Sequence, residues 1–289
     1  MEKTRRKANE GAAGGGEAVY VYCIGLLHEV EPVINARQDL PPPIEPRGRL
    51  ETVGAAEITA VVSSVPLADY GEGALEERLA DPAWMAARVM RHERVVEHLA
   101  SRASVVPLRF GTVYLSPGRV HEMLDQKWNE LYATLGRLRG REEWGVNLYA
   151  DRARLREAVV NLSPRLRALA EQAAGASPGQ GYLLRKKIEA ARADEARAET
   201  RRVAREVEET LTAEAEGSAR LRVHRDESGE HGDVAAKLAF LVARERFQNF
   251  RAAAERLAEE YDPAGFRLEL TGPWPAYNFA ASEGKNSDE

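Results

Sequence analysis

One long run of residues restricts the fold of this chain more than any other feature. From Tyr182 to about Glu216 the sequence is dominated by Ala, Glu and Arg and contains neither proline nor glycine. The apolar positions of this run are few: Leu184, Ile188, Val203, Val207 and Leu211. So narrow an apolar line predicts one long helix, solvated on most sides and supported by ion pairs four residues apart.

The segment before this run predicts a helical partner for it. Its apolar residues recur at alternating steps of four and three: Leu155, Val159, Leu162, Leu166, Leu169 and Ala173. Ser163-Pro164 should kink or restart that helix, and a loop is expected from Gly175 to Gly181. We therefore expect an antiparallel helical hairpin over about 151–217, with a narrow Ala-rich seam of coiled-coil type.

Strand patterns flank the hairpin. A strand is expected from Trp144 to Ala150, a β-hairpin turns near Ser228-Gly229, and a last strand runs from Phe266 to Leu270. Between the last two lies a helix with five apolar residues on one face: Phe247, Phe250, Ala254, Leu257 and Tyr261. The order β-α(α)-β-β-α-β predicts a ferredoxin-like (split βαβ) unit whose first crossover is extended by the helical hairpin.

The N-terminal part predicts a separate mixed unit. Strands are expected at Val19–Gly25, Leu50–Val53 and Ile58–Ser63, and the prolines of 28–49 should prevent regular structure over most of that interval. Asp81-Pro82 is a typical helix start, and the helix should run to Ala103.

Two further elements complete this unit. The residues from Ser104 to Tyr114 are expected to form one buried strand, with Pro107 at a sheet edge or a bulge. An apolar stripe from Val120 to Leu138 predicts one helix that ends at Gly140.

These elements predict an α+β protein with two domains. We expect an N-terminal domain over 18–140 and a C-terminal domain over 141–280. The polar ends, 1–17 and 281–289, should be a disordered and a loose tail, because they offer nothing to pack.

Charge and cysteine content exclude several classes of protein. Charged residues make up 30% of the chain with a net charge of −5, which does not suit broad phosphate or nucleic-acid binding. Cys23 is the single cysteine, so no internal disulfide forms. The apolar run from Ala18 to Leu27 is too short to cross a bilayer. We expect a cytoplasmic protein without a membrane span.

No set of residues predicts catalysis, a cofactor or a metal. His92 and His98 are six residues apart, so they do not form the H-E-x-x-H zinc pattern, and His92 lies on the apolar line of its helix like a core residue. Cys23 lies within a strand pattern, and neither G-x-S-x-G nor G-K-S/T occurs. We expect a protein that is not an enzyme and has no cofactor.

Two aromatic segments are candidates for binding a partner. In the first, Pro273 and Pro275 stiffen a loop that carries Trp274, Tyr277 and Phe279. These rings either anchor another protein or fold back over the sheet to seal the core between the domains. In the second, Arg109 and Phe110, the arginine is either a buried bidentate partner for a carboxylate or a contact for another protein.

The same segments carry a family resemblance. The chain contains R-H-E-R-V-V at 91–96, V-V-P-L-R-F-G-T-V at 105–113 and G-P-W-P-A-Y-N-F at 272–279, after an opening strand at 19–25. In this order the blocks resemble the gas vesicle protein family GvpL/GvpF, from about Val19 to Phe279.

The resemblance implies a two-domain α+β protein needed for gas vesicle formation. It implies that the partners are the small hydrophobic shell protein and other accessory proteins, and that the chain associates with the vesicle during its nucleation and assembly. The residues taken by themselves leave an alternative open, a ligand-binding regulatory module built on a ferredoxin-like domain.

Overall fold

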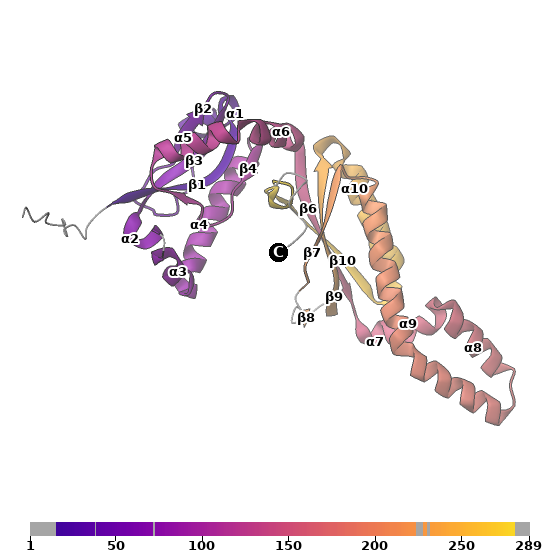
Figure 1. Ribbon diagram of the computed structural model, residues 1–289. Coiled ribbons are helices and arrows are strands. Elements are labelled where there is room, and N and C mark those ends of the chain that lie inside the picture. Colours follow the sequence, from indigo (N-terminus) through magenta and orange to yellow (C-terminus); the bar gives the residue numbers. More distant parts are fainter. Residues whose placement is uncertain (1–15, 38, 72, 224–227, 230–231, 281–289) are drawn as a thin grey trace, which may run out of the picture. The chain divides into compact units, whose positions relative to one another are not determined.

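The computed structural model describes residues 16–37, 39–71, 73–223, 228–229 and 232–280 (Figure 1). It divides into two compact units, one ending at Gly136 and the other beginning at Arg137. The predicted tails lie almost entirely outside the described residues, apart from Gly16 and Glu17. In the described part of the chain no helix is long and apolar enough to cross a membrane.

The first unit is built on an antiparallel sheet with the order β2-β3-β1-β4, in which β5 also pairs with β1. The strands are β1 (Glu17–Leu26), β2 (Glu51–Ala55), β3 (Ile58–Pro66), β4 (Val105–Pro107) and β5 (Val113–Tyr114). Every residue of β1 from Ala18 to Leu26 is buried, so this apolar strand is covered on both faces. It is the centre of the unit.

Helices complete the first unit: α1 (Leu27–Asn35), α2 (Leu67–Tyr70), α3 (Ala74–Leu79), α4 (Pro82–Ala100), α5 (Pro117–Gln126) and α6 (Trp128–Leu138), the last of which continues into the second unit. The expected start of α4 is confirmed, since the Asp81 carboxylate accepts hydrogen bonds from the backbone N–H groups of Ala83 and Trp84. His92, Val96 and Leu99 on its predicted apolar face are buried.

Two expectations for this unit are wrong. The helix expected from Val120 to Leu138 is divided at Lys127, whose backbone leaves the helical region. The single strand expected over 104–114 is found as two short ones. Most of the interval 28–49 is irregular, as expected, since its described residues after Asn35 form no helix or strand. Its first part belongs to α1, in which burial of Val30 and Ile34 offsets the one backbone hydrogen bond that Pro32 cannot donate.

The chain leaves the sheet between these two strands. Pro107 ends β4, which is an edge strand as its missing N–H requires. Residues 108–112 then form a loop before β5 begins at Val113. This loop carries Arg109 and Phe110.

The second unit contains an antiparallel sheet with the order β10-β6-β9-β7, in which β8 also pairs with β9. The strands are β6 (Arg141–Ala150), β7 (Gly217–Leu221), β8 (Ser228–Gly229), β9 (Gly232–Ala243) and β10 (Phe266–Trp274). The turn predicted near Ser228-Gly229 adjoins residues that the structure does not describe.

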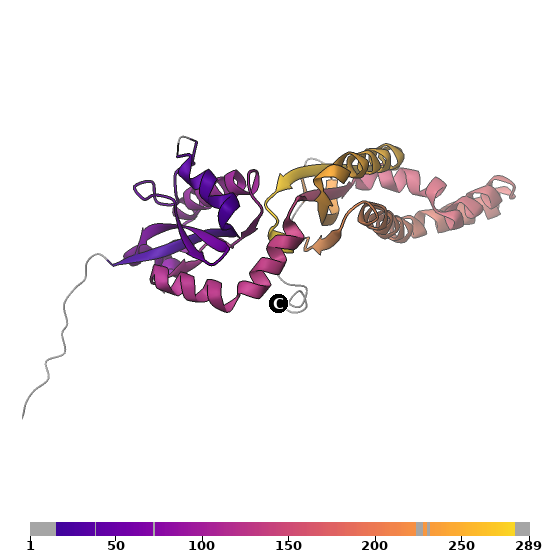
Figure 2. The same ribbon diagram turned by 90° about the horizontal axis from the view of Figure 1, so that it is seen from above.

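The described part of the second unit has four long helices: α7 (Arg152–Leu162), α8 (Pro164–Ala174), α9 (Pro178–Thr212) and α10 (Phe247–Tyr261). Residues of α7, α9 and α10 share a core with the sheet, whereas α8 packs on α7 and α9. Val146 and Leu148 of β6 meet Val207 of α9 and Phe250 of α10 in one buried core. Figures 1 and 2 show the long helix α9 running beyond the sheet to the turn of the helical hairpin.

The helical hairpin has the predicted restart. α7 ends at Leu162, the Ser163 hydroxyl accepts a hydrogen bond from the Leu166 N–H, and Pro164 begins α8. Away from the sheet the hairpin has a small core of its own, formed by Val159, Leu166 and Ile188. Few side chains are buried in this part of the hairpin, as the small number of apolar residues in its sequence predicts.

Candidate interaction surfaces

A chain of hydrogen bonds shapes the loop 108–112 of the first unit. The Gly111 N–H donates to Tyr20 Oη (3.1 Å), and this oxygen lies 2.9 Å from His92 Nδ1. His92 Nε2 lies 3.1 Å from the Leu108 carbonyl, which can only accept. The proton of neutral His92 is therefore on Nε2, and Nδ1 accepts from the Tyr20 hydroxyl.

Burial keeps His92 uncharged. The ring is fully buried, and this desolvation lowers the pKa of His92 to about 4, although the bond to the Leu108 carbonyl opposes the shift. Burial likewise raises the pKa of Tyr20 far above its usual range. The prediction that His92 is a core residue is confirmed.

The same loop presents the first predicted contact pair. Phe110 is half-buried, with its ring centre 6.2 Å from that of Tyr20 and 6.0 Å from that of His92. Arg109 is exposed, so the alternative in which it is a buried bidentate partner for a carboxylate is wrong. Phe110 thus fixes the loop, and Arg109 is left at the surface.

Further polar contacts from α4 fix the proline-rich segment, and sequence reasoning missed them. Arg88 Nε donates to Glu45 Oε1 (2.8 Å), which also accepts from the Tyr70 hydroxyl (2.7 Å). Arg91 Nη1 donates to the carbonyl of Ile44 (2.9 Å), a fully buried residue. The only sequence sign was the position of these arginines beside an apolar helix face.

The C-terminal aromatic loop of the second unit begins where β10 ends. The Gly272–Pro273 peptide bond is cis, and the register of β10 against β6 shifts between Thr271 and Trp274. Trp274 is 48% exposed, and its indole Nε1–H donates to Thr271 Oγ1 at 3.1 Å. The Thr271 hydroxyl therefore orients the indole ring, much of which faces solvent.

A buried carboxylate holds the rest of this loop. Glu143 of β6 is 4% exposed and accepts from the backbone N–H (3.0 Å) and the side-chain amide (2.6 Å) of Asn278. Burial raises the pKa of Glu143, while the two Asn278 bonds oppose the shift. Arg137 Nη2 donates to the Phe279 carbonyl at 2.7 Å. Tyr277 and Phe279 are half-buried, so of the three rings Trp274 is the most exposed.

We expect Asn278→Ala to loosen this loop. The variant leaves one oxygen of buried Glu143 without its side-chain donor, which should cost about 1–3 kcal/mol of local stability. Amide hydrogen exchange of 276–279 should become faster, while exchange in β6 away from Glu143 stays the same. Unchanged exchange of the loop would show that Glu143 does not hold it.

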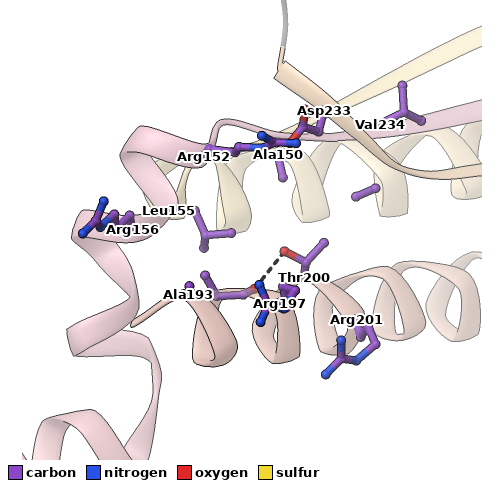
Figure 3. A pocket seen from close by; sticks show the side chains of 12 residues that line it. Ala150, Arg152, Leu155, Arg156, Ala193, Arg197, Thr200, Arg201, Asp233 and Val234 are labelled. Atoms are coloured by element: carbon purple, nitrogen blue, oxygen red, sulfur yellow. Dashed lines mark hydrogen bonds and ion pairs between the residues drawn. The ribbon is translucent and has the colours of Figure 1, made fainter. Parts of the chain in front are cut away.

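A third surface is a groove between α9 and the sheet of the second unit (Figure 3). It has a volume of about 720 Å³ and adjoins a second hollow of about 360 Å³ that shares Thr200, Arg201 and Ala235. Figure 3 shows Leu155 reaching from α7, and Thr200 from α9, into the space between. We call the two hollows the arginine-rimmed groove; its rim includes Arg152, Arg156, Arg197, Arg201, Arg205 and Arg220.

The described residues offer little for catalysis or metal binding. Among them no group of three or more His, Cys, Asp or Glu side chains could hold a metal ion. Cys23 is fully buried, and burial raises the pKa of its thiol far above the usual range, so it is a poor nucleophile. The predicted contact residues form two groups, Arg109 and Phe110 in the first unit and the three aromatic residues in the second.

Comparison with known proteins connects the chain to one family. A family model described as gas vesicle synthesis protein GvpL/GvpF matches residues 18–281. Gas vesicle protein L of Streptomyces sp. strain CB03234 is 32% identical over 78% of this chain and 80% of its own length. Gas vesicle protein F of the same strain is 27% identical over 66% of this chain and 76% of its own length.

A solved structure has a similar fold. The crystal structure of the gas vesicle protein GvpF from Anabaena sp. PCC7120 superposes with a TM-score of 0.64, covering 94% of this chain and all of that one at 17% identity. At that identity the likeness concerns the mixed helix-and-sheet fold alone.

Proposed function

This chain belongs to the GvpL/GvpF family of gas vesicle synthesis proteins, and on that basis we propose that it is an accessory or minor structural protein of gas vesicle assembly. In this role it binds the small hydrophobic shell protein and other accessory proteins while a vesicle nucleates and grows. It acts by presenting fitted surfaces and not by catalysis, and it is located at the vesicle in the cytoplasm.

The proposal rests on the way in which hydrogen bonds hold the C-terminal aromatic loop. The exposed Trp274 is held in place by its hydrogen bond to Thr271, while Glu143 and Arg137 fix the residues that follow. A rigid aromatic side chain loses little conformational entropy on binding and so makes an effective anchor. Trp274, with Tyr277 and Phe279 beside it, is suited to an apolar partner surface.

The chemistry of the partner supports the same role. A small, strand-rich hydrophobic subunit aggregates through its apolar face or its unpaired sheet edge before it is incorporated. A soluble accessory protein can cover such a face until the subunit joins the shell. Arg109 and Phe110, in the loop fixed by His92, are proposed as a second contact of this kind.

We also propose that the second unit is a ferredoxin-like domain. Its strand order β10-β6-β9-β7, with every neighbour antiparallel, supports this assignment. The helical crossover between β6 and β7 and the α10 crossover between β9 and β10 support it as well. The extension of the first crossover by α8 and most of α9 then adds surface without altering the sheet.

Co-purification with the shell protein tests the function. We expect Trp274→Ala/Tyr277→Ala to reduce recovery of the shell protein on the immobilised full-length chain by about tenfold or more, because two anchor rings are lost. Tyr182→Ala/Leu183→Ala is the matched control, since it removes exposed apolar side chains at the start of α9. Equal recovery of the shell protein with both variants would show that the aromatic loop does not bind it. Failure of the wild-type chain to recover the shell protein would show that the two proteins do not bind.

A further inference from the structure

The arginine-rimmed groove has a charge opposite to that of the whole protein. Its lining includes seven basic and two acidic side chains, a formal excess of +5, whereas the complete chain carries −5. Concentrated positive charge over one hollow of an acidic protein attracts anionic partners and steers their approach. The groove therefore differs electrostatically from the remaining surface.

Part of this charge is not neutralised within the protein. Four of the lining arginines have a carboxylate partner. Arg152 pairs with Asp233, and Arg156 pairs with Glu189. Arg197 pairs with Asp194, and Arg220 pairs with Glu208. Arg201 and Arg205 have no carboxylate partner in the part of the chain that the structure describes, and both are exposed on α9. These two charges remain available to another molecule.

The two available charges continue a stripe with helical spacing. Arg197, Arg201 and Arg205 follow one another at intervals of four residues, so they lie along one face of α9 over about 12 Å. The first of them, Arg197, also pairs with Asp194 of the same helix at the surface. Like charges at this spacing weaken a helix by a few tenths of a kcal/mol each. Nothing in the fold of α9 requires that cost, which points to a use outside the chain.

The interior of the groove is mostly apolar. Small residues of both walls line it, including Ala150, Ala193, Ala196 and Ala235, together with Leu155. The Thr200 hydroxyl already donates to the Ala196 carbonyl at 2.9 Å (Figure 3). Aliphatic side chains of a ligand can therefore pack there without burying an unpaired polar group.

We propose that the arginine-rimmed groove binds an acidic amphipathic helix of a partner protein. Carboxylates at four-residue spacing on that helix pair with Arg197, Arg201 and Arg205, and aliphatic side chains beside them enter the apolar interior next to Leu155. This surface is separate from the C-terminal aromatic loop. The inference holds or fails independently of the gas vesicle role.

The lining favours a peptide over a nucleic acid. Single-stranded nucleic acid is bound by aromatic side chains on which bases stack, and neither hollow is lined by an aromatic residue. The Asp233 and Glu208 carboxylates of the lining would also repel a phosphate backbone. A helix with discrete carboxylates can avoid both and still reach the arginines.

Selection from a peptide-display library on the full-length chain tests the proposal. The enriched peptides should combine Asp or Glu at four-residue spacing with Leu, Ile or Val. The affinity of a selected, fluorescently labelled peptide should fall about tenfold for Arg197→Glu/Arg201→Glu. It should stay near the wild-type value for Arg251→Glu/Arg256→Glu, which makes the same charge change on α10.

A charge-swapped peptide distinguishes the loss of the arginine charges from misfolding of the double variant. Replacing the acidic residues of the selected peptide by Lys should restore binding to Arg197→Glu/Arg201→Glu and abolish binding to the wild type. Three results would each overturn the proposal: enriched peptides without acidic residues, equal weakening by the two double variants, or tighter binding of a short oligouridine than of the selected peptide.

Discussion

Between pH 7 and pH 4 the wild-type chain will lose about 3 kcal/mol of unfolding free energy that a His92→Gln variant will not lose. His92 titrates at about 4 in the folded protein and near 6.5 when exposed. Below pH 6.5 the unfolded state therefore binds a proton that the folded state does not. Stability is fully present above pH 6.5, falls as the pH approaches 4, and does not change further from this group below that.

Burial explains why the folded state resists protonation of His92. The ring has no exposed surface, so a charge on it would be desolvated. Protonation would also remove the acceptor that Nδ1 offers to the Tyr20 hydroxyl, while the Nε2–H bond to the Leu108 carbonyl would remain. Because Tyr20 Oη accepts from the Gly111 N–H, protonation disturbs the loop of Arg109 and Phe110 through Tyr20.

Urea titrations of the full chain at several pH values measure this effect. The glutamine variant keeps a donor for Leu108 and cannot become charged, so it should cost about 1 kcal/mol at pH 7 through loss of the Tyr20 contact. The difference between wild type and variant isolates His92 from other titrating groups. A difference that does not depend on pH would show that His92 is not held neutral.

The second large effect is expected at Gly265, where the chain enters β10. Its φ of +89° lies in the left-handed region, and a Cβ there would meet Arg154 Cβ at 2.7 Å and the Leu155 N–H nitrogen at 3.0 Å. Gly265→Ala should therefore destabilise the second unit by about 3 kcal/mol, through backbone strain and displacement of the first turn of α7. Since α7 carries Leu155, the arginine-rimmed groove should also be disturbed.

Gly140→Ala separates the two contributions. Gly140 also has a positive φ, +72°, but a Cβ there would have nothing within 4 Å. Its replacement should cost only the backbone strain, about 1 kcal/mol. Equal losses for the two alanine variants in thermal unfolding would show that close packing against α7 does not matter.

Local chemistry was predictable from the sequence in both units. Asp81 before Pro82 predicts a helix cap, and Ser163-Pro164 predicts a kink or restart of a helix; both depend only on neighbouring residues, and both the cap and the restart are found. The spacing of His92 on its apolar helix line placed it in the core, where it lies. The thin apolar line of α9 predicted a long and largely solvated helix.

Features that depend on distant residues were not predictable. The loop 108–112 leaves the sheet because Tyr20 and His92 bind its backbone, and a strand-like apolar pattern cannot show this. The break at Lys127 lies between two apolar segments with the same helical spacing.

The interaction surfaces also depend on residues that lie far apart in the sequence. Glu143 fixes the C-terminal loop across 135 residues, and the arginine-rimmed groove joins side chains of α7, α9 and β9. The aromatic residues of the loop could be named from the sequence, but the carboxylate that holds them could not.

Gas vesicle formation in cells tests the central claim most directly. In a strain whose own copy of this gene is deleted, wild-type protein should restore vesicles counted by electron microscopy. Trp274→Ala/Tyr277→Ala, expressed to the same level and folded to the same extent, should restore few or none, whereas Tyr182→Ala/Leu183→Ala should restore them. Full restoration by the Trp274→Ala/Tyr277→Ala variant would contradict the account, because it would show that assembly does not depend on the surface that this loop presents.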